Sequence, residues 1–518
     1  MKQAFYVTTP IYYVNGEAHI GHTYTTVLAD SLARHHRLRG DETFFLTGSD
    51  EHGEKMVEAA NARGESPAQT AAFFSKKFQQ AWDDLGLSYD RFIRTTDEDH
   101  EALVKCILQQ VYDGGHIEFR EYEGDYCVGC ERFLTERDLE NGLCKDHERA
   151  PERRAEGNYF FKMSEHFEWL AGHIEAQPDF IRPDRYRNEV LAMLREDSGL
   201  GDLCISRPKT RLSWGIELTF DPDYVCYVWF DALINYLTAI GYPESGRFQP
   251  LWGASHHLIG KDILKPHAVF WPTMLRVLGV APPRQLNVHG YWNVDDRKVS
   301  KSLGNMVSPL VMDEKYGFES FRYFLLRSMS FGVDASFSEE EMVARINADL
   351  ANNLGNLVSR TLNMTARFAD GRVPVPGEAG ALEDDVRAAC AEATIEADRH
   401  MQTVEPHRAL EAIFRAVDAT NRYLEQREPW KAAKDPERAA SVPTTLYTCC
   451  EALRVLALLL APFLPKAAAE ILARVGAAGA LYTARLPEDA AWGRLTVGAT
   501  TTKGEALFPR RDPPDGPR

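Results

Sequence analysis

The first fifty residues constrain the fold most, because they pass from an apolar run to a periodic segment and back to an apolar run. Residues 6–10 predict a buried strand that leads into a turn-rich loop. The next segment places its apolar side chains on one face, as an α-helix does, and residues 44–46 predict a second strand. Such a unit almost always crosses over right-handed into a parallel sheet, and ligands bind at the carboxyl ends of its strands. The sequence therefore predicts an α/β fold.

Two histidines, His19 and His22, stand at the start of the predicted helix with Gly21 between them. Backbone N–H groups and the helix dipole favour an anion at this place, and imidazoles add hydrogen bonds to phosphate oxygens. A glycine lets a flat ring such as adenine lie against the backbone. Helix-capping or core histidines explain the motif equally well, whereas zinc is disfavoured because no third ligand is close in sequence.

A second motif lies far downstream, where Lys298, Ser300 and Lys301 precede a Gly-Asn turn at residues 304–305. It predicts a mobile loop whose charges can reach a bound triphosphate, although alone it is an ordinary charged loop. Together the two motifs resemble the signature pair of class I aminoacyl-tRNA synthetases. Val299 replaces the methionine most often found in that signature, at a position that packs rather than reacts.

Four residues have the spacing of a closed zinc site. Cys127 and Cys130 form one short pair and Cys144 and His147 the other, with a polar loop between the pairs. Two such pairs predict a tetrahedral Cys₃His site for one structural Zn²⁺, with free thiols as the alternative. All four positions are filled, which leaves none for a substrate.

Length and charge limit the function further. The 518 residues predict three or four domains. The formal net charge of −17 argues against non-specific nucleic-acid binding, so a nucleic acid would be held by local basic and stacking sites. No secretory signal is visible, and nine irregularly spaced cysteines fit a reducing cytoplasm better than a disulfide framework. The most apolar run, residues 455–464, is too short to span a bilayer.

Matching segments at residues 9–16, 228–232 and 260–272 extend the resemblance to bacterial methionyl-tRNA synthetases with one zinc knuckle, over the whole chain except its tail. The resemblance implies a Rossmann-like catalytic domain with a parallel sheet, split by a zinc-knuckle insertion and followed by an α-helical bundle. The implied boundaries are 1–114 and 224–290 for the two catalytic halves, 115–223 for the insertion, 291–337 for a stem-contact region with the Lys-Ser loop and 338–500 for the anticodon-binding bundle. The tail, 501–518, is rich in Pro, Arg and Asp and lacks apolar periodicity, so it is expected to be disordered.

The implied reaction activates methionine with ATP to methionyl-adenylate and pyrophosphate, then transfers methionine to the terminal adenosine of a tRNA with the anticodon CAU. This would serve translation initiation and elongation. Carried over position by position, the catalytic residues would be His19, His22, Lys298 and Lys301. ATP would enter with Mg²⁺ and bind these residues together with Gly21, Ser300 and Asp262, the last on the ribose.

The methionine pocket implied by the resemblance is largely aromatic, which suits a flexible thioether. Its residues would be Ile11, Tyr13, Trp229, Ala232, Leu233, Tyr236, His267 and Trp271, with Asp50 holding the amino group. Leu233 stands where some relatives have proline, and plain core packing is the alternative for each aromatic. Because a pocket discriminates one methylene by only about 1–3 kcal/mol, homocysteine would enter, and its rejection as a thiolactone is a hypothesis taken from the family.

Three further residues coincide with the anticodon readers of the family. Asn356 and Arg360 lie one helical turn apart, and Trp430 offers an indole near a helix start. A capping asparagine and a packed tryptophan are the alternatives. A monomer is expected, because the chain lacks the extra domain that dimerises some relatives.

The rest of the chain predicts ordinary elements. Helices are expected at residues 55–63, 66–85, 409–424 and 446–464, with Ser338 and Glu341 as a capping box. Residues 227–236 predict a buried strand entering a helix, and residues 288–291 the last strand before the Lys-Ser loop.

Other classes of protein fit less well. A small-molecule nucleotidylyltransferase shares the two phosphate motifs but needs neither zinc knuckle nor bundle. Synthetases for isoleucine, valine or leucine need more room for an editing domain. A non-catalytic zinc-dependent RNA-binding protein leaves both phosphate motifs unexplained, and a dehydrogenase lacks its G-x-G-x-x-G after the first strand.

Overall fold

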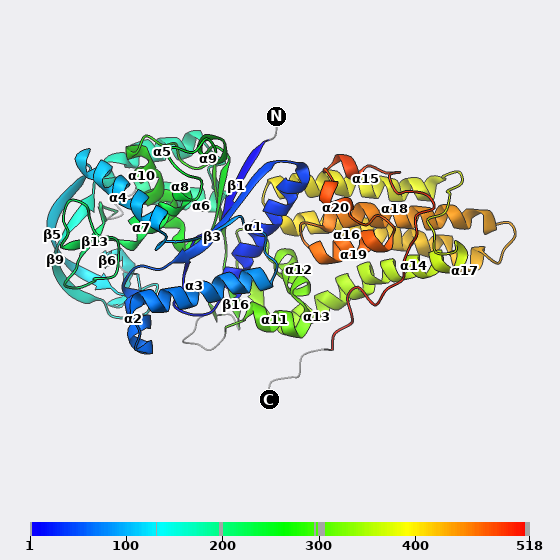
Figure 1. The fold of residues 1–518 in the computed structure, drawn as a ribbon, viewed down its shortest axis with the longest axis horizontal. Helices are drawn as coiled ribbons and strands as arrows, with labels where there is room; N and C mark the ends of the chain where they lie inside the picture. The colour runs from blue at the N-terminus through cyan, green and yellow to red at the C-terminus, as the bar shows by residue number, and fades with distance from the viewer. Residues whose placement is uncertain (1–2, 131, 196–199, 295–296, 299–305, 513–518) are drawn as a thin grey trace. The chain divides into compact units, whose positions relative to one another are not determined.

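A computed structural model describes residues 3–130, 132–195, 200–294, 297–298 and 306–512 (Figure 1). Contacts divide the chain into two compact units. The sheet unit consists of residues 4–18 and 44–289, and the helical unit of residues 1–3, 19–43 and 290–518. The first fifty residues thus contribute to both units.

The sheet unit is built around a seven-stranded sheet with the order β10-β15-β14-β1-β3-β2 and with β4 paired to β3. Its strands are β1 (Ala4–Thr8), β2 (Tyr12–Tyr13), β3 (Glu42–Asp50), β4 (Arg91–Arg94), β10 (Ile181–Arg182), β14 (Ser255–Gly260) and β15 (Gln285–His289). The pairings β1–β14, β14–β15, β10–β15, β2–β3 and β3–β4 are parallel, which confirms the predicted parallel sheet. Because β1 lies between β3 and β14, its carboxyl end is a switch point of the kind that binds ligands.

Short helices follow the strands at this edge, and longer ones complete the layers. They are α2 (Glu54–Arg63), α3 (Pro67–Asp84), α4 (Glu98–Asp113), α7 (Val228–Leu233), α8 (Asn235–Thr238), α9 (Phe248–Trp252), η3 (Lys261–Ile263), η4 (Pro266–Phe270) and α10 (Trp271–Val277). The predicted helices at 55–63 and 66–85 are confirmed by α2 and α3. Ser66 starts α3, where its hydroxyl accepts the N–H of Gln69.

Most of the residues predicted as an insertion form an antiparallel sheet of their own, with the order β11-β9-β5-β6, whereas β10 joins the main sheet. The strands are β5 (Ile117–Cys127), β6 (Arg132–Leu134), β9 (Glu152–Phe161) and β11 (Leu203–Cys204). β5 and β9 pair from Ile117 to Tyr126 and form the long curved ribbon of this sheet in Figure 1. The small strands β7 (Leu139–Glu140) and β8 (Leu143–Cys144) and the helices α5 (Phe167–Ala176) and α6 (Asp184–Arg195) complete this region.

Two predicted strands are wrong. The strand expected in residues 227–236 ends before them: β13 (Tyr224–Cys226) pairs antiparallel with β12 (Ser206–Pro208), and α7 begins at Val228. A short apolar run predicts burial but does not distinguish a strand from a buried helix. Nor is β15 the last strand before the Lys-Ser loop, because β16 (Trp292–Val294) and β17 (Arg297–Lys298) intervene.

The helical unit packs long amphipathic helices around one core. Its helices are α1 (Ile20–Arg39), α11 (Pro309–Tyr316), α12 (Phe318–Ser328), α13 (Glu339–Arg345), η6 (Ile346–Gly355), α14 (Asn356–Phe368), α15 (Ala381–Gln402), α16 (Pro406–Arg427), α17 (Pro429–Ala432), α18 (Val442–Leu460), α19 (Pro465–Arg474) and α20 (Ala480–Thr483). α15, α16 and α18 lie side by side (Figure 1). The predicted helices at 409–424 and 446–464 are confirmed, and Ser338 caps α13 at the N–H of Glu341.

One described helix, Ala439–Leu460, is long and apolar enough to cross a membrane by length and composition. Its most apolar window is 94% buried, so its side chains form the core of the bundle.

A buried ion pair holds α1 in the helical unit. The guanidinium of Arg322 on α12 lies 2.5 Å from the carboxylate of Asp30 and donates to the hydroxyl of Ser31 at 2.8 Å. Arg322 also donates to the carbonyl oxygens of Pro462 and Phe463. The first helix is thereby fixed to the bundle.

The predicted disorder of the tail does not hold for residues 501–512. Arg511 and Asn347 exchange two hydrogen bonds of 2.8 and 2.9 Å, and the carbonyl of Glu505 accepts from Arg474. Phe508 is 8% exposed. Pro and Gly residues remove helical periodicity from this segment without preventing it from packing as an extended chain.

Candidate active site and metal site

The histidine pair at the start of α1 is fixed by the backbone. His19 is the N-cap, and its Nδ1 accepts the N–H of Gly21 at 3.2 Å. Nδ1 of His22 accepts the N–H of His19 at 3.4 Å, and the two rings stack with centroids 3.8 Å apart. A neutral imidazole that accepts at Nδ1 carries its proton on Nε2. Each ring therefore presents Nε2 as a donor suited to a phosphate oxygen, at a helix end that already favours an anion.

Gly21 packs closely against the ring of His19. A Cβ at position 21 would lie 3.1 Å from Cε1 and 3.3 Å from Nδ1 of His19, so the ring would have to move. The sequence indicated room for a ligand at Gly21, whereas the structure shows that the glycine also makes room for the neighbouring imidazole.

Both flanks of the Lys-Ser loop reach the histidine helix. The N–H of Ile20 donates to the carbonyl of Val307 at 2.9 Å, and the ring of Tyr24 meets that of Trp292 on β16 at 6.2 Å. Ser300 and Lys301 lie outside the described residues, as does the side chain of Lys298. The structure therefore places the ends of the predicted loop, but not the loop itself, at the amino end of α1.

Two predicted aspartates lie after parallel strands of the sheet unit. Asp50 ends β3, opposite Tyr13 of β2, and is 4% exposed. Asp262 follows β14 in η3 and is exposed. A Cβ at Gly260 would lie 2.6 Å from Oδ1 of Asp262, so this carboxylate would have to shift if any other residue stood there.

Four predicted pocket residues gather into one aromatic cluster. The ring of His267 lies 6.1 Å from Trp229 and 5.8 Å from Tyr236, and Tyr236 lies 6.0 Å from Trp271. The other predicted members, Ile11, Tyr13, Ala232 and Leu233, are buried or half-buried residues of the sheet unit, and all but Ala232 belong to the same hydrophobic core as the cluster.

His267 is held as one neutral tautomer. Its Nδ1–H donates to the carbonyl of Ile263 at 2.9 Å, so its Nε2 accepts the hydroxyl of Tyr236 at 2.8 Å. Burial lowers the pKa of His267 to about 4. The cluster therefore offers apolar ring surface with a satisfied polar centre, which suits a thioether.

A buried network beside this cluster was missed by sequence reasoning. Asp231 on α7 accepts from Nδ1 of His52 at 2.6 Å and from Nε2 of His100 at 2.8 Å, and all three residues are at most 3% exposed. Burial alone would lower the pKa of His52, but the charge of Asp231 outweighs it and raises that pKa. The network joins the segment after Asp50 to the helix that carries Trp229. Its members lie 179 and 131 positions apart, so no local pattern could have shown it.

The four predicted metal ligands converge. Cys127 and Cys144 are buried, and a Cβ at Gly129 would lie 2.5 Å from the His147 ring. Nδ1 of His147 lies 3.9, 3.3 and 3.8 Å from the sulfurs of Cys127, Cys130 and Cys144. Tetrahedral zinc with bonds of about 2.0–2.3 Å separates its ligand atoms by about 3.3–3.8 Å. The cluster can therefore bind a metal such as zinc.

The predicted anticodon residues lie on one part of the helical unit. The guanidinium of Arg360 on α14 lies 5.4 Å from the ring centroid of Trp430 on α17, and Asn356 is exposed one turn before it. Arg360 also pairs with Glu425 at 3.4 Å. The indole and the guanidinium are thus close together, a combination that binds unpaired bases in other proteins.

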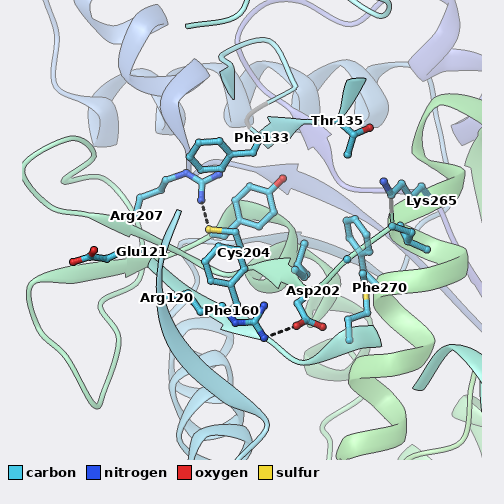
Figure 2. A pocket seen from close by; sticks show the side chains of 15 residues that line it. Arg120, Glu121, Phe133, Thr135, Phe160, Asp202, Cys204, Arg207, Lys265 and Phe270 are labelled. Carbon is cyan, nitrogen blue, oxygen red and sulfur yellow. Dashed lines mark hydrogen bonds and ion pairs between the residues drawn. The ribbon is translucent and has the colours of Figure 1, made fainter. Parts of the chain in front are cut away.

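A cavity of about 320 Å³ lies in the sheet unit between the insertion sheet and η4 (Figure 2). Arg207 donates to the sulfur of Cys204 at 3.3 Å, and Arg120 pairs with Asp202 at 2.6 Å. Lys265 and Phe270 line another wall, two residues before His267 and one residue before Trp271. No predicted site residue lines this cavity.

The chain matches known proteins over almost its whole length. The family described as tRNA synthetases class I (M) matches residues 5–144 and 136–362, and the anticodon binding domain of methionyl tRNA ligase matches residues 373–512. Methionine–tRNA ligase of Caldanaerobacter subterraneus is 41% identical over 99% of this chain and 80% of its own length. That of Streptomyces coelicolor is 41% identical over 98% and 97%.

Solved structures of a related protein are also similar to this chain. Mycobacterium tuberculosis methionyl-tRNA synthetase in complex with methionyl-adenylate has a TM-score of 0.93 and 40% identity, over 98% of this chain and all of that one. The free form of the same protein has a TM-score of 0.87 and 37% identity over 99% of both chains.

Proposed function

Because this chain belongs to the methionine–tRNA ligases, which are class I aminoacyl-tRNA synthetases, we propose how its residues share the two steps of that reaction. Methionine and ATP first give methionyl-adenylate and pyrophosphate, and the methionyl group then passes to the terminal adenosine of tRNA. The observation that carries the assignment is the histidine pair, whose Nδ1 atoms are occupied by backbone N–H groups and whose Nε2 atoms are donors.

In the first step the carboxylate of methionine attacks the α-phosphate in line and expels pyrophosphate. His19 and His22 bind the phosphates, Lys298, Ser300 and Lys301 meet the charge that develops on pyrophosphate, and Asp262 accepts the ribose hydroxyls. Mg²⁺ accompanies ATP and supplies further positive charge. Positioning and electrostatic stabilisation account for the catalysis, since no side chain has to become covalently attached.

Methionine binds at the aromatic cluster. Its thioether contacts the edges of Trp229, Tyr236 and Trp271. Asp50 holds the ammonium group of methionine. Because the pKa of His267 is about 4, this imidazole stays neutral near pH 7 and does not repel the ammonium group. In the second step a 2′-hydroxyl of the terminal adenosine attacks the carbonyl of methionyl-adenylate. The new ester bond forms, the bond between the carbonyl carbon and the phosphate oxygen breaks, and AMP and the hydroxyl proton leave.

The tRNA is selected at the other predicted site, where Trp430 stacks on a base of the CAU anticodon and Asn356 and Arg360 bind base edges. The Cys127–His147 cluster holds one structural zinc. Its four ligands fill a tetrahedral shell, so the metal takes no part in the reaction. The nine free cysteines fit a cytoplasmic enzyme.

ATP–pyrophosphate exchange with each of the twenty amino acids tests the proposal. Methionine alone should support exchange at low concentration, with homocysteine as a weaker substrate. Exchange that depends on another amino acid, or on none, would contradict the assignment and favour another class I synthetase or a nucleotidylyltransferase. A matched pair of variants, His22→Asn and His173→Asn, separates loss of phosphate contacts from loss of an imidazole elsewhere.

Metal content tests the zinc assignment separately. The purified chain should keep one zinc after passage over a chelating resin, and Cys144→Ser should keep none. Zinc in the Cys144→Ser chain at the level of the unaltered chain would contradict it.

A further inference from the structure

Three potential metal ligands meet where β5 begins and β9 ends, outside every site described above. His116 directly precedes β5, and Glu165 and His166 lie in η2 (Met163–His166), directly after β9. The N–H of Lys162 donates to the carbonyl of His116 at 2.9 Å, which holds the two strand ends in register. One ligand atom from each of the three side chains lies within 4.8 Å of the other two.

The two imidazoles are close to the separation that a shared ion imposes. Their ring centroids are 6.0 Å apart, with an angle of 49° between the ring planes. Two imidazoles bound to one ion by bonds of about 2.0–2.1 Å have centroids about 5 Å apart. Side-chain rotations that bring the two ring centroids about 1 Å closer would therefore let both imidazoles bind one ion. A Cβ at Gly114 would lie 3.0 Å from the His116 ring, so this imidazole packs closely against the glycine.

His166 supplies a second, independent observation. Its Nε2 is buried and has no hydrogen-bond partner among the described residues. Buried polar atoms are nearly always satisfied by protein, water or an ion, so an orphan ring nitrogen beside another imidazole and a carboxylate indicates a missing ligand. The nearby positive charge of Arg276 opposes a cation here, and the carboxylate of Glu165 offsets it.

We propose that His116, Glu165 and His166 form a second metal site, distinct from the cysteine cluster, for a divalent ion such as Zn²⁺, Cu²⁺ or Ni²⁺. Two imidazoles and one carboxylate are the ligands these ions prefer, whereas Mg²⁺ and Ca²⁺ prefer oxygen. Glu165 is exposed, so water completes the coordination shell. The bound ion would link the residue that precedes β5 to η2, directly before α5.

Zn²⁺ titration of the full chain tests the site, after a chelating resin has removed weakly held ions. A chromophoric chelator that competes for Zn²⁺ reports uptake above the metal retained by the resin-treated protein. We expect one additional equivalent. His116→Ala and His166→Ala should each weaken its binding at least tenfold, and Glu165→Gln by less. Glu168→Gln, an exposed carboxylate in the first turn of α5, is the matched control and should bind like the unaltered chain.

Arg276→Gln gives a test of the opposite sign. Removal of its positive charge should tighten Zn²⁺ binding by severalfold. Circular dichroism and methionine-dependent exchange, which should be unchanged in all variants, guard against misfolding.

Cu²⁺ paramagnetic resonance identifies the ligands directly. One equivalent of Cu²⁺ should show hyperfine coupling to two imidazole nitrogens, reduced to one in His116→Ala. Equal Zn²⁺ affinity in the unaltered chain and in both histidine variants, or Cu²⁺ spectra without nitrogen coupling, would mean an adventitious ion only and would overturn the proposal.

Discussion

At His19 and His22 the chemistry depends on which ring nitrogen carries the proton. The backbone decides this, since the N–H groups of residues 21 and 19 occupy the two Nδ1 atoms. The sequence indicated phosphate binding at a helix start but left capping as an equal alternative. The structure confirms the capping, because His19 caps α1 through Nδ1, and this contact leaves Nε2 as a donor, so phosphate binding stays a compatible prediction.

Gly21→Ala tests whether this arrangement matters. The new Cβ would lie 3.1 Å from the His19 ring and displace it by a few tenths of an ångström. We expect adenylate formation to slow by about 10- to 100-fold, because small misplacement of binding groups is costly, with little change in the dissociation constant for methionine. Stopped-flow adenylate formation measures the first quantity and equilibrium dialysis the second.

Gly172→Ala is the matched control, since a Cβ on this helical glycine meets nothing within 4 Å. Unaltered adenylate formation in Gly21→Ala would show that ring stacking is not needed.

The buried side chain of His267 should make the stability of the folded chain depend on pH. Its pKa is about 4 in the folded chain, against 6.5 for an ordinary histidine, so the unfolded chain binds the proton more tightly. Stability should therefore fall as the pH falls from 6.5 to 4, by about 1.4 kcal/mol per pH unit from this residue. Thermal unfolding at pH 7.5 and 5.5 should show a larger loss in the unaltered chain than in His267→Gln. Equal losses would mean that another group carries the acid sensitivity.

At the scale of elements, local signals were sufficient for most helices and for the parallel sheet. The helices at residues 66–85 and 409–424 could be predicted because their apolar periodicity depends only on residues close in sequence. The apolar run at 227–236 failed because burial does not specify backbone shape, and α7 and α8 use it as helix. The tail failed because its partners, Asn347 and Arg474, lie far away in sequence.

Asp231 on α7 is hydrogen-bonded to His52, which follows β3. We therefore expect its substitution to weaken methionine binding. Asp231→Asn removes the charge that raises the pKa of His52, and the loss of one partner from a buried charged pair typically costs roughly 3–5 kcal/mol. We expect a lower melting temperature and a higher KM for methionine, with the KM for ATP less affected. Steady-state exchange kinetics and calorimetry provide the measurements.

Asp223→Asn, an exposed aspartate of the same unit, should behave like the unaltered chain. Equal rises of both KM values in Asp231→Asn would indicate general destabilisation instead of a role in positioning the pocket.

At the scale of the whole molecule, amino acid activation and tRNA selection are assigned to different sets of residues. Trp430→Ala should remove one stacking contact, worth about 1–3 kcal/mol, and lower kcat/KM for tRNA charging by about 5- to 150-fold. ATP–pyrophosphate exchange, which needs no tRNA, should stay unchanged in the same preparation. A parallel loss of exchange would show that the tryptophan is structural.

Lys301→Ala tests the central claim most directly, namely that the distant lysine–serine loop serves the same ATP as the paired imidazoles. The measurement is the single-turnover rate of methionyl-adenylate formation, with methionine affinity determined on the same protein. A lysine that meets charge only as pyrophosphate departs should lower this rate by about 100-fold or more while the affinity stays within about threefold. Equal losses of rate and affinity, or an unchanged rate, would contradict it.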